Sequence, residues 1–160
     1  MTEEDFVLAI KKHSGIIHKI LYLYLDSMEE REDMAQEIQL QAWKAIGRFR
    51  GDSQFSTWLY RVALNTVFTF NRKKRIKLDP IDQHDFKQEN NEPSDQSEKL
   101  IFEIKKFSEV DKTIITLHLE DYDNGEIAEI LGLTKNNVTV KIHRIKELLK
   151  FKLNPKYGST

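Results

Sequence analysis

The side chains best suited to chemistry in this chain of 160 residues are hydrogen-bonding and cationic groups near its C-terminal end. Amide and guanidinium groups form paired hydrogen bonds with adenine and guanine edges, and threonine and valine methyl groups suit the methyl group of thymine. The candidate residues of these types lie within one short stretch: Thr134, Asn136, Asn137, Thr139, Val140, Lys141 and Arg144. Residues 135–156 hold seven Lys or Arg against one acid, Glu147. The stretch therefore predicts a helix that enters the major groove of DNA.

A helix-turn-helix must position these groups, and the residues before them fit that motif. Ala128 has the small side chain needed where two helices cross closely, and Gly132 tolerates the positive φ of a tight turn. Val138 and Ile142, four residues apart, predict the buried side of the second helix. Thr134 predicts its N-cap, and the N–H groups at that helix start would face a DNA phosphate. DNA binding is the leading hypothesis, ahead of a plain helical hairpin.

A second group of candidates combines aromatic rings, a polar glycine loop and basic side chains. Rings beside basic and amide groups suit unstacked bases, because stacking contributes roughly 1–3 kcal/mol per base. The candidates run from the loop into the following helix: Phe49, Arg50, Asp52, Ser53, Phe55, Trp58, Arg61, Asn65, Arg72, Lys73 and Arg75. The alternative is that the rings are core residues, which we accept for two of the three, while Phe55 and Trp58 suit both roles.

The spacing of apolar residues predicts an all-α fold of two small helical domains. Helices are predicted over residues 3–25, from Ser27 through the inner face that ends at Phe49, over 56–75, and near 98–107, 110–119, 124–131 and 134–152. The first helix has its stripe at Phe6, Ile10, Ile17 and Leu21, widened by Val7, Ile20 and Tyr24. Predicted N-caps are Ser27, Ser108, Asp123 and Thr134. The domains are predicted over residues 1–76 and 98–155.

The net charge of −1 is unevenly distributed between the predicted domains and the segment between them. Residues 1–78 carry +3, residues 79–98 carry −6 and residues 99–160 carry +2. The acidic segment contains two prolines and few apolar residues. Residues 77–97 are therefore predicted to form a flexible, extended linker.

The composition excludes several classes of protein. The absence of cysteine excludes a disulfide scaffold, a thiol nucleophile and thiolate metal sites. The longest apolar run, Ile20 to Leu25, is far shorter than the roughly 20 residues of a membrane span, and the acidic N-terminus is unlike a signal peptide. The five histidines are scattered, and no phosphate-binding glycine loop occurs. We expect a cytoplasmic, non-enzymatic protein without catalytic residues, metal site or cofactor.

Two blocks of sequence, in this order, resemble the sigma factors of bacterial RNA polymerase. The first block resembles region 2 and contains Asp33-Met34-Ala35-Gln36-Glu37, Trp43-Lys44-Ala45, Phe55-Ser56-Thr57-Trp58-Leu59-Tyr60-Arg61-Val62-Ala63, Asn65 and Arg72-Lys73. The second resembles region 4 and contains Glu126-Ile127-Ala128-Glu129-Ile130-Leu131-Gly132-Leu133-Thr134, Val138 and His143-Arg144. With no regulatory extension or middle domain expected, the chain is similar to the compact extracytoplasmic-function (ECF) class.

The resemblance implies a factor that binds core polymerase and directs promoter-specific initiation. The second helix would dock on the clamp helices of the β′ subunit through Asp33, Gln36, Glu37 and Gln41. The alternative interpretation is that Asp33 and Glu37 lie on one face of a helix that is only solvated. The loop Phe49–Ser56 would take a flipped base of the −10 element, with the helix Thr57–Arg75 holding the surrounding DNA during melting. The second helix of the helix-turn-helix would recognise the −35 element.

The resemblance also carries implications for the linker and for regulation. The linker acids would mimic nucleic acid in the basic channel of the polymerase: Asp79, Asp82, Asp85, Glu89 and Glu92. An anti-sigma factor is a further partner common in the class, although no residue of this sequence identifies one.

Departures from the family pattern concern the DNA-binding helix and the helix that begins near residue 110. Many members have Gly-Thr-Val-Lys-Ser-Arg where this chain has residues 136–141, so Lys141 replaces an arginine. Lysine binds phosphate as a point charge rather than guanine through paired hydrogen bonds, so promoter sequences do not transfer from relatives. Val110-Asp111 replaces the frequent Leu-Pro.

Two alternatives remain open on sequence grounds. A helix-turn-helix repressor or activator would dimerise on a palindromic site and would not use the residues from Asp33 to Glu37. A protein-interaction adaptor would use region 4 chiefly to bind another protein. Binding to core polymerase discriminates the sigma hypothesis from the repressor.

Overall fold

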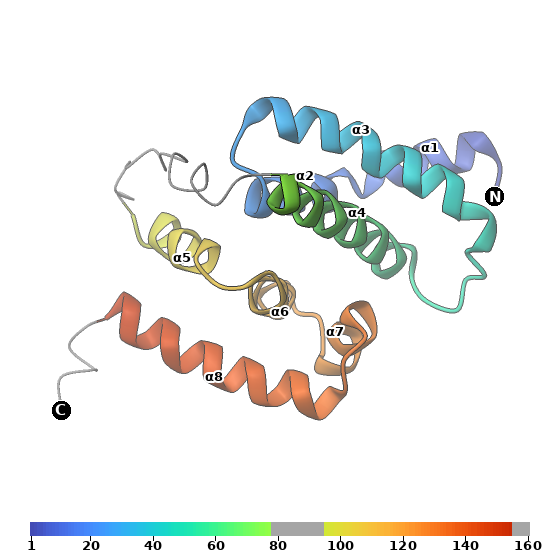
Figure 1. The fold of residues 1–160 in the computed structure, drawn as a ribbon. Coiled ribbons are helices and arrows are strands. Elements are labelled where there is room, and N and C mark those ends of the chain that lie inside the picture. The colour runs from blue at the N-terminus through green and yellow to red at the C-terminus, as the bar shows by residue number, and fades with distance from the viewer. Residues whose placement is uncertain (78–94, 155–160) are drawn as a thin grey trace. The chain divides into compact units, whose positions relative to one another are not determined.

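The computed structural model describes residues 1–77 and 95–154, and the chain divides into two compact units. The described residues form eight α-helices and one 3-10 turn, without a strand among them (Figure 1). The predicted all-α class with two helical domains is confirmed. Most of the predicted linker, including its acids from Asp79 to Glu92, lies outside the described residues.

The N-terminal unit is a small bundle in which the longest helix packs against two others. Its elements are α1 (Glu3–Lys12), α2 (Ser14–Tyr24), α3 (Met28–Ala45), η1 (Ile46–Arg48) and α4 (Phe55–Lys77). Helix α4 packs on α2 and α3. The core at these contacts contains side chains with no exposed surface: Ile38, Ala42, Leu59, Ala63 and Val67. Ser27 caps α3 as predicted, its Oγ accepting the Glu30 N–H at 3.0 Å.

The prediction of a single helix over residues 3–25 is wrong, because the helix is interrupted at His13. This residue ends α1 and precedes α2, with φ −105° and ψ 18°. Ser14 and Gly15 follow it, and both are weaker helix formers than alanine or leucine, with glycine about 1 kcal/mol worse than alanine. Two further placements also differ from the prediction. Val7 is 43% exposed rather than part of the core, and Phe49 lies beyond α3, after the 3-10 turn.

The C-terminal unit consists of α5 (Gln96–Lys105), α6 (Glu109–Leu119), α7 (Asn124–Leu131) and α8 (Lys135–Leu153). Helix α8 packs against the other three. The predicted caps are confirmed by one hydrogen bond each: Ser108 Oγ accepts from Asp111 N at 3.2 Å, Asp123 Oδ1 from Glu126 N at 2.8 Å and Thr134 Oγ1 from Asn137 N at 3.1 Å.

Candidate nucleic-acid interfaces

The turn between α7 and α8 has the geometry that its sequence predicts. Gly132 ends α7 in the left-handed conformation, with φ 70° and ψ 31°, and its N–H donates to the carbonyl of Ala128. The N–H of Leu133 donates to the same carbonyl at 2.9 Å. Ala128 itself is 6% exposed, as a small residue at a helix crossing must be. The turn fixes the direction in which α8 begins.

Helix α8 presents one buried side and one exposed side. Val138, Ile142, Ile145 and Leu149 are buried, which confirms the predicted inner face of this helix. The predicted DNA-reading residues Thr134, Asn136, Asn137, Thr139, Val140 and Arg144 are exposed, and Lys141 is half-buried. The candidate residues therefore lie on the solvent side of a helix that packing holds in place.

Two of these residues are held by side chains from neighbouring helices. The Asn124 amide of α7 donates to Thr139 Oγ1 at 2.9 Å, and that hydroxyl donates to the Lys135 carbonyl at 2.9 Å. The ammonium of Lys141 lies 3.7 Å from the Asp111 carboxylate of α6. With its hydroxyl engaged on both sides, Thr139 has its methyl group left for a partner. Sequence reasoning missed both contacts because each joins two helices.

The aromatic candidates of the N-terminal unit form one cluster. Ring centroids lie 6.0 Å apart for Phe49 and Phe55, 5.4 Å for Phe49 and Trp58, and 5.4 Å for Phe55 and Trp58. All three rings are half-buried. Gly51, with φ 77°, turns the loop between Phe49 and α4. The rings thus pack on one another and keep part of their surface for a partner, rather than dividing into core and surface residues.

His13 extends this cluster from a distant part of the sequence. Its ring centroid lies 5.3 Å from that of Phe55. Burial, with a smaller contribution from Lys12, lowers the pKa of His13 below its usual value of 6.5. The ring is therefore neutral at pH 7 and packs as an aromatic group. Sequence reasoning treated the histidines as scattered, and only the break between α1 and α2 indicates a special position.

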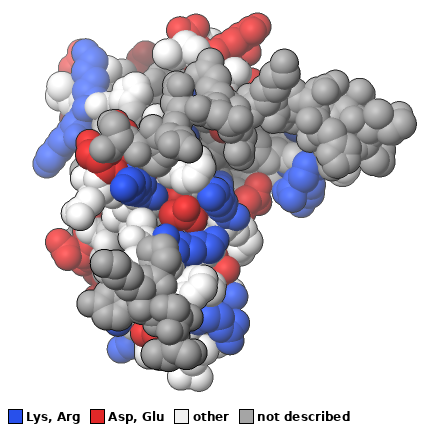
Figure 2. All heavy atoms as spheres, turned by 90° about the vertical axis from the view of Figure 1, so that its left-hand side faces the viewer, with Lys and Arg blue, Asp and Glu red and all other residues white. Residues whose placement is uncertain are grey.

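Polar and basic residues line the loop and the exposed side of α4. Arg50, Asp52, Arg61, Asn65, Arg72, Lys73 and Arg75 are exposed, and Ser53 is half-buried. The ammonium of Lys74 pairs with the Glu30 carboxylate of α3 at 2.6 Å. Figure 2 shows Lys and Arg side chains interspersed with Asp and Glu on the face turned to the viewer. The exposed cations of the loop and of α4 are therefore the candidates for contact with phosphate.

The predicted polymerase-docking residues lie on α3 near the exposed apolar side chains of Leu40 and Trp43. Asp33 and Gln36 are exposed, while Glu37 and Gln41 are half-buried and joined by a 2.8 Å hydrogen bond from the Gln41 amide to Glu37 Oε1. Leu40 is 46% exposed and Trp43 is 45% exposed. We call these six residues the α3 surface. The two apolar members were not among the predicted site residues, although Trp43 contributed to the resemblance.

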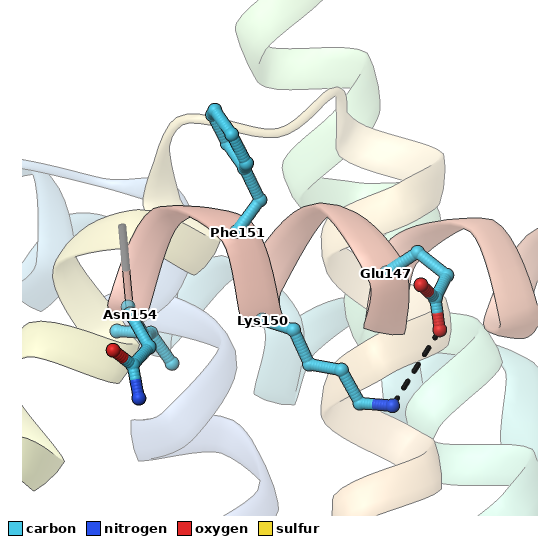
Figure 3. Close-up of a pocket in the computed structure, with 5 residues that line it drawn as sticks. Glu147, Lys150, Phe151 and Asn154 are labelled. Atoms are coloured by element: carbon cyan, nitrogen blue, oxygen red, sulfur yellow. Dashed lines mark hydrogen bonds and ion pairs between the residues drawn. The ribbon is translucent and has the colours of Figure 1, made fainter. Parts of the chain in front are cut away.

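A further hollow lies at the C-terminal end of α8. It is lined by Glu147, Lys150, Phe151, Leu153 and Asn154, with an ion pair between Lys150 and Glu147 at 3.5 Å (Figure 3). The Phe151 ring projects away from the Lys150 side chain in this view. The lining residues come from the last turns of α8 and its C-cap, Asn154, and include no nucleophile such as serine or cysteine. Among the described residues no three His, Asp or Glu side chains gather as metal ligands would.

Comparisons with known proteins identify both units. The family model of Sigma-70 region 2 matches residues 9–76, and that of Sigma-70, region 4, matches residues 98–149. The ECF RNA polymerase sigma-E factor of Haemophilus influenzae is 30% identical over 170 residues, covering 96% of this chain and 89% of the relative. The ECF RNA polymerase sigma-E factor of Escherichia coli K12 is 28% identical, with 96% and 88% covered.

Solved structures share the fold. A chain in the co-crystal structure of the sigma factor RpoE with the anti-sigma factor NepR from Bartonella quintana has a TM-score of 0.74 at 16% identity, covering 94% of this chain and 97% of that one. A chain in the structure of CnrH with the cytosolic domain of CnrY has a TM-score of 0.69 at 19% identity, covering 96% and 90%. Within the described part of the chain, no helix is both long enough and apolar enough to cross a membrane.

Proposed function

The chain belongs to the ECF class of RNA polymerase sigma factors, which direct promoter-specific initiation of transcription, and we propose that its two domains contact different parts of the promoter. In this proposal the domain of residues 1–76 binds core polymerase and the −10 element. The domain of residues 98–155 binds the −35 element, and the linker of residues 77–97 joins them. The protein acts by binding alone, without catalytic residues, in the cytoplasm where its polymerase works.

The observation that carries this proposal is the two-sided character of α8. Val138, Ile142, Ile145 and Leu149 are buried on the side of α8 that packs against α5, α6 and α7, while amide, methyl and cationic groups remain exposed at the start of the helix. Thr134 caps this helix start, which leaves N–H groups and the positive end of the helix dipole for a phosphate. This arrangement supports recognition of duplex DNA in the major groove by Asn136, Asn137, Val140 and Arg144.

The aromatic cluster supports the proposed role at the −10 element. A base removed from the stack needs an apolar ring to lie against, and flipping costs a few kcal/mol that the pocket must recover. The half-buried rings of Phe49, Phe55 and Trp58 offer that surface, with Arg50, Asp52 and Ser53 on the adjoining loop for hydrogen bonds. The exposed cations of α4 from Arg61 to Arg75 would hold the flanking phosphates.

The α3 surface supports docking on core polymerase. Acidic and amide groups lie on it beside the exposed Leu40 and Trp43, a mixture suited to a protein interface with an apolar centre and a polar rim. We assign this surface to the clamp helices of the β′ subunit. An anti-sigma factor is a further proposed partner, because both structural neighbours were solved with one or with a cytosolic domain bound.

The experiment that tests the proposal is transcription in vitro with core polymerase on a library of random promoters, paired with a pull-down of core enzyme. The double variant Lys141→Ala and Arg144→Ala should weaken binding of the holoenzyme to the selected promoters. It should also reduce the slope of log K against log salt by about 0.9, since one phosphate contact, that of Lys141, is lost, whereas Arg144 is assigned to base edges. The control Lys146→Ala with Lys150→Ala removes the same charge further along α8 and should have a smaller effect.

Unchanged promoter output and an unchanged salt slope in the Lys141 and Arg144 variant would contradict the assignment of α8. Failure to capture core polymerase, together with tight binding of a palindromic duplex by a dimer, would favour the helix-turn-helix repressor instead.

A further inference from the structure

Asp111 of α6 contacts Lys141 on the proposed DNA-binding side of α8. Its carboxylate lies 3.7 Å from the Lys141 ammonium, and the two side chains are 33% and 30% exposed. Ion pairs of this exposure are weak, because water screens both charges, so the contact opens readily. Lys141 is therefore available to another anion, but only in competition with a carboxylate already beside it.

The position of Lys141 on the helix indicates what that other anion is. Residues 139 and 141 lie about 200° apart around a helix with 3.6 residues per turn. Asn124 holds Thr139 at one edge of the exposed sector and Asp111 holds Lys141 at the other. Asn136, Val140 and Arg144 lie in the sector between these edges. A helix in the major groove points its central residues at base edges and its flanking residues at the phosphates, so Lys141 is placed for a phosphate.

We propose that Asp111 sets the affinity of this sigma factor for duplex promoter DNA by competing with a phosphate for Lys141. This inference rests on the proposed function of α8 and adds a residue that the function does not assign. When DNA binds, Lys141 exchanges the carboxylate for a phosphate, and the carboxylate remains close to the negatively charged backbone. Both effects lower affinity, and both are strongest at low salt, where screening is weak.

Asp111 also has a structural role that the test must separate from its effect on DNA. It lies in the first turn of α6, its backbone N–H donates to the Ser108 cap, and its charge favours the positive end of the helix dipole. Asp111→Asn keeps the size and polarity of the side chain and removes the charge. Asp111→Ser provides a second neutral variant, in case the amide forms a new hydrogen bond.

The experiment is a double-mutant cycle on the full-length chain in holoenzyme, measured as binding to a duplex promoter selected from the library over a range of salt concentrations. Asp111→Asn should tighten binding about two- to fivefold at low salt, consistent with the energy of an exposed ion pair, and the gain should shrink as salt rises. In a Lys141→Ala background the same change should give a clearly smaller gain, because only the repulsion between the carboxylate and the DNA backbone is then left to remove. Glu129→Gln, which removes an exposed carboxylate from α7, is the matched control and should change affinity less.

Two outcomes would overturn the proposal: no gain from either neutral variant with thermal unfolding unchanged, or an equal gain with and without Lys141. The second outcome would mean that Asp111 acts through general charge alone. If the Lys141→Ala and Arg144→Ala double variant binds the duplex normally, the proposed DNA-binding role of α8 is wrong. That result is distinct from the two outcomes above, which contradict only the role of Asp111.

Discussion

The two proposed DNA-binding surfaces are constructed from the chain in different ways. In the C-terminal unit, the candidate residues from Thr134 to Arg144 belong to one helix, whose start is set by its own cap and by the glycine two residues before it. In the N-terminal unit, the aromatic cluster joins the α1–α2 break, the loop after η1 and the start of α4. A surface of the first kind depends on local rules, whereas one of the second kind depends on the packing of distant segments. We therefore expect substitutions to separate binding from folding more cleanly in α8 than in the cluster.

The largest expected effect is loss of an aromatic ring from the cluster. Phe55→Ala and Trp58→Ala should each reduce promoter opening about 5- to 150-fold, because stacking contributes roughly 1–3 kcal/mol per base. Reactivity of unpaired thymines in the −10 element measures the opening. Both variants should also lower the unfolding temperature, since each ring contacts the other two.

Phe102→Ala, which removes a 39% exposed ring from the other unit, is the control and should leave opening near normal. A folded Phe55→Ala protein that opens promoters normally would show that the ring is structural only.

A backbone substitution in the C-terminal unit should have the next largest effect. Gly132→Ala should destabilise the protein by about 1–2 kcal/mol, because an L-residue in the left-handed conformation is strained. An added Cβ would meet no atom within 4 Å at Gly132 or at Gly15, so crowding contributes at neither position. Gly15→Ala, within α2, should instead stabilise by up to about 1 kcal/mol. Urea unfolding measures both, and equal effects would contradict the assigned role of the turn.

A smaller effect is expected from the hydrogen bond that holds Thr139. Asn124→Ala should weaken duplex binding by a few fold, because a typical hydrogen bond contributes about 0.5–1.5 kcal/mol. Capture of core polymerase should be unchanged. Thr139→Val removes the partner hydroxyl, so the double variant should bind no more weakly than Thr139→Val alone. Full additivity would show that the two side chains act independently.

The smallest expected effect is a pH dependence of stability. The pKa of His13 in the folded state is lowered by burial and by Lys12, so the unfolded chain takes up a proton first as pH falls. Stability should be constant above about pH 7.5 and decrease as pH falls through 6.5 toward the lowered value. His118 acts in the same direction, because burial and Lys146 lower its pKa and outweigh the opposing effect of Asp121.

His13→Phe keeps a ring against Phe55 and should reduce the difference in unfolding temperature between pH 7.5 and pH 5.5. A decrease of the same size in the variant would assign the pH dependence to other groups.

The features predicted correctly from sequence are those that neighbouring residues determine. The caps at Ser108, Asp123 and Thr134, the left-handed Gly132 and the buried Val138 and Ile142 each follow from side-chain type within one turn or one loop. The misplaced elements are those for which one regular pattern decided the prediction. The apolar stripe over residues 3–25 predicts one helix, and it hides the division at His13 that the weak helix formers Ser14 and Gly15 favour.

The predictions of the candidate sites lacked the contacts that join residues far apart in the sequence. Asn124 lies 15 residues from Thr139 and Asp111 lies 30 from Lys141, so neither contact has a periodic signal. The sequence analysis identified Asp111 as a departure from the family pattern, but it predicted no effect of this residue on DNA binding. Phe55 and Trp58 were predicted to suit both a core and a binding role, but the half-buried state of Phe49 had no signal, since hydrophobic spacing separates inner from outer faces and does not mark a surface that is partly both.

The two tryptophans of this chain provide intrinsic fluorescence at two of its proposed binding surfaces. Trp43 lies on the surface assigned to polymerase and Trp58 in the cluster assigned to the opened strand, while the C-terminal unit contains no indole. Tryptophan fluorescence excited at the red edge of the absorption band would thus report binding at region 2 of this chain without an attached dye. A Trp43→Phe protein would leave this chain a single indole, Trp58, whose quenching would report contact of the cluster with an unpaired base.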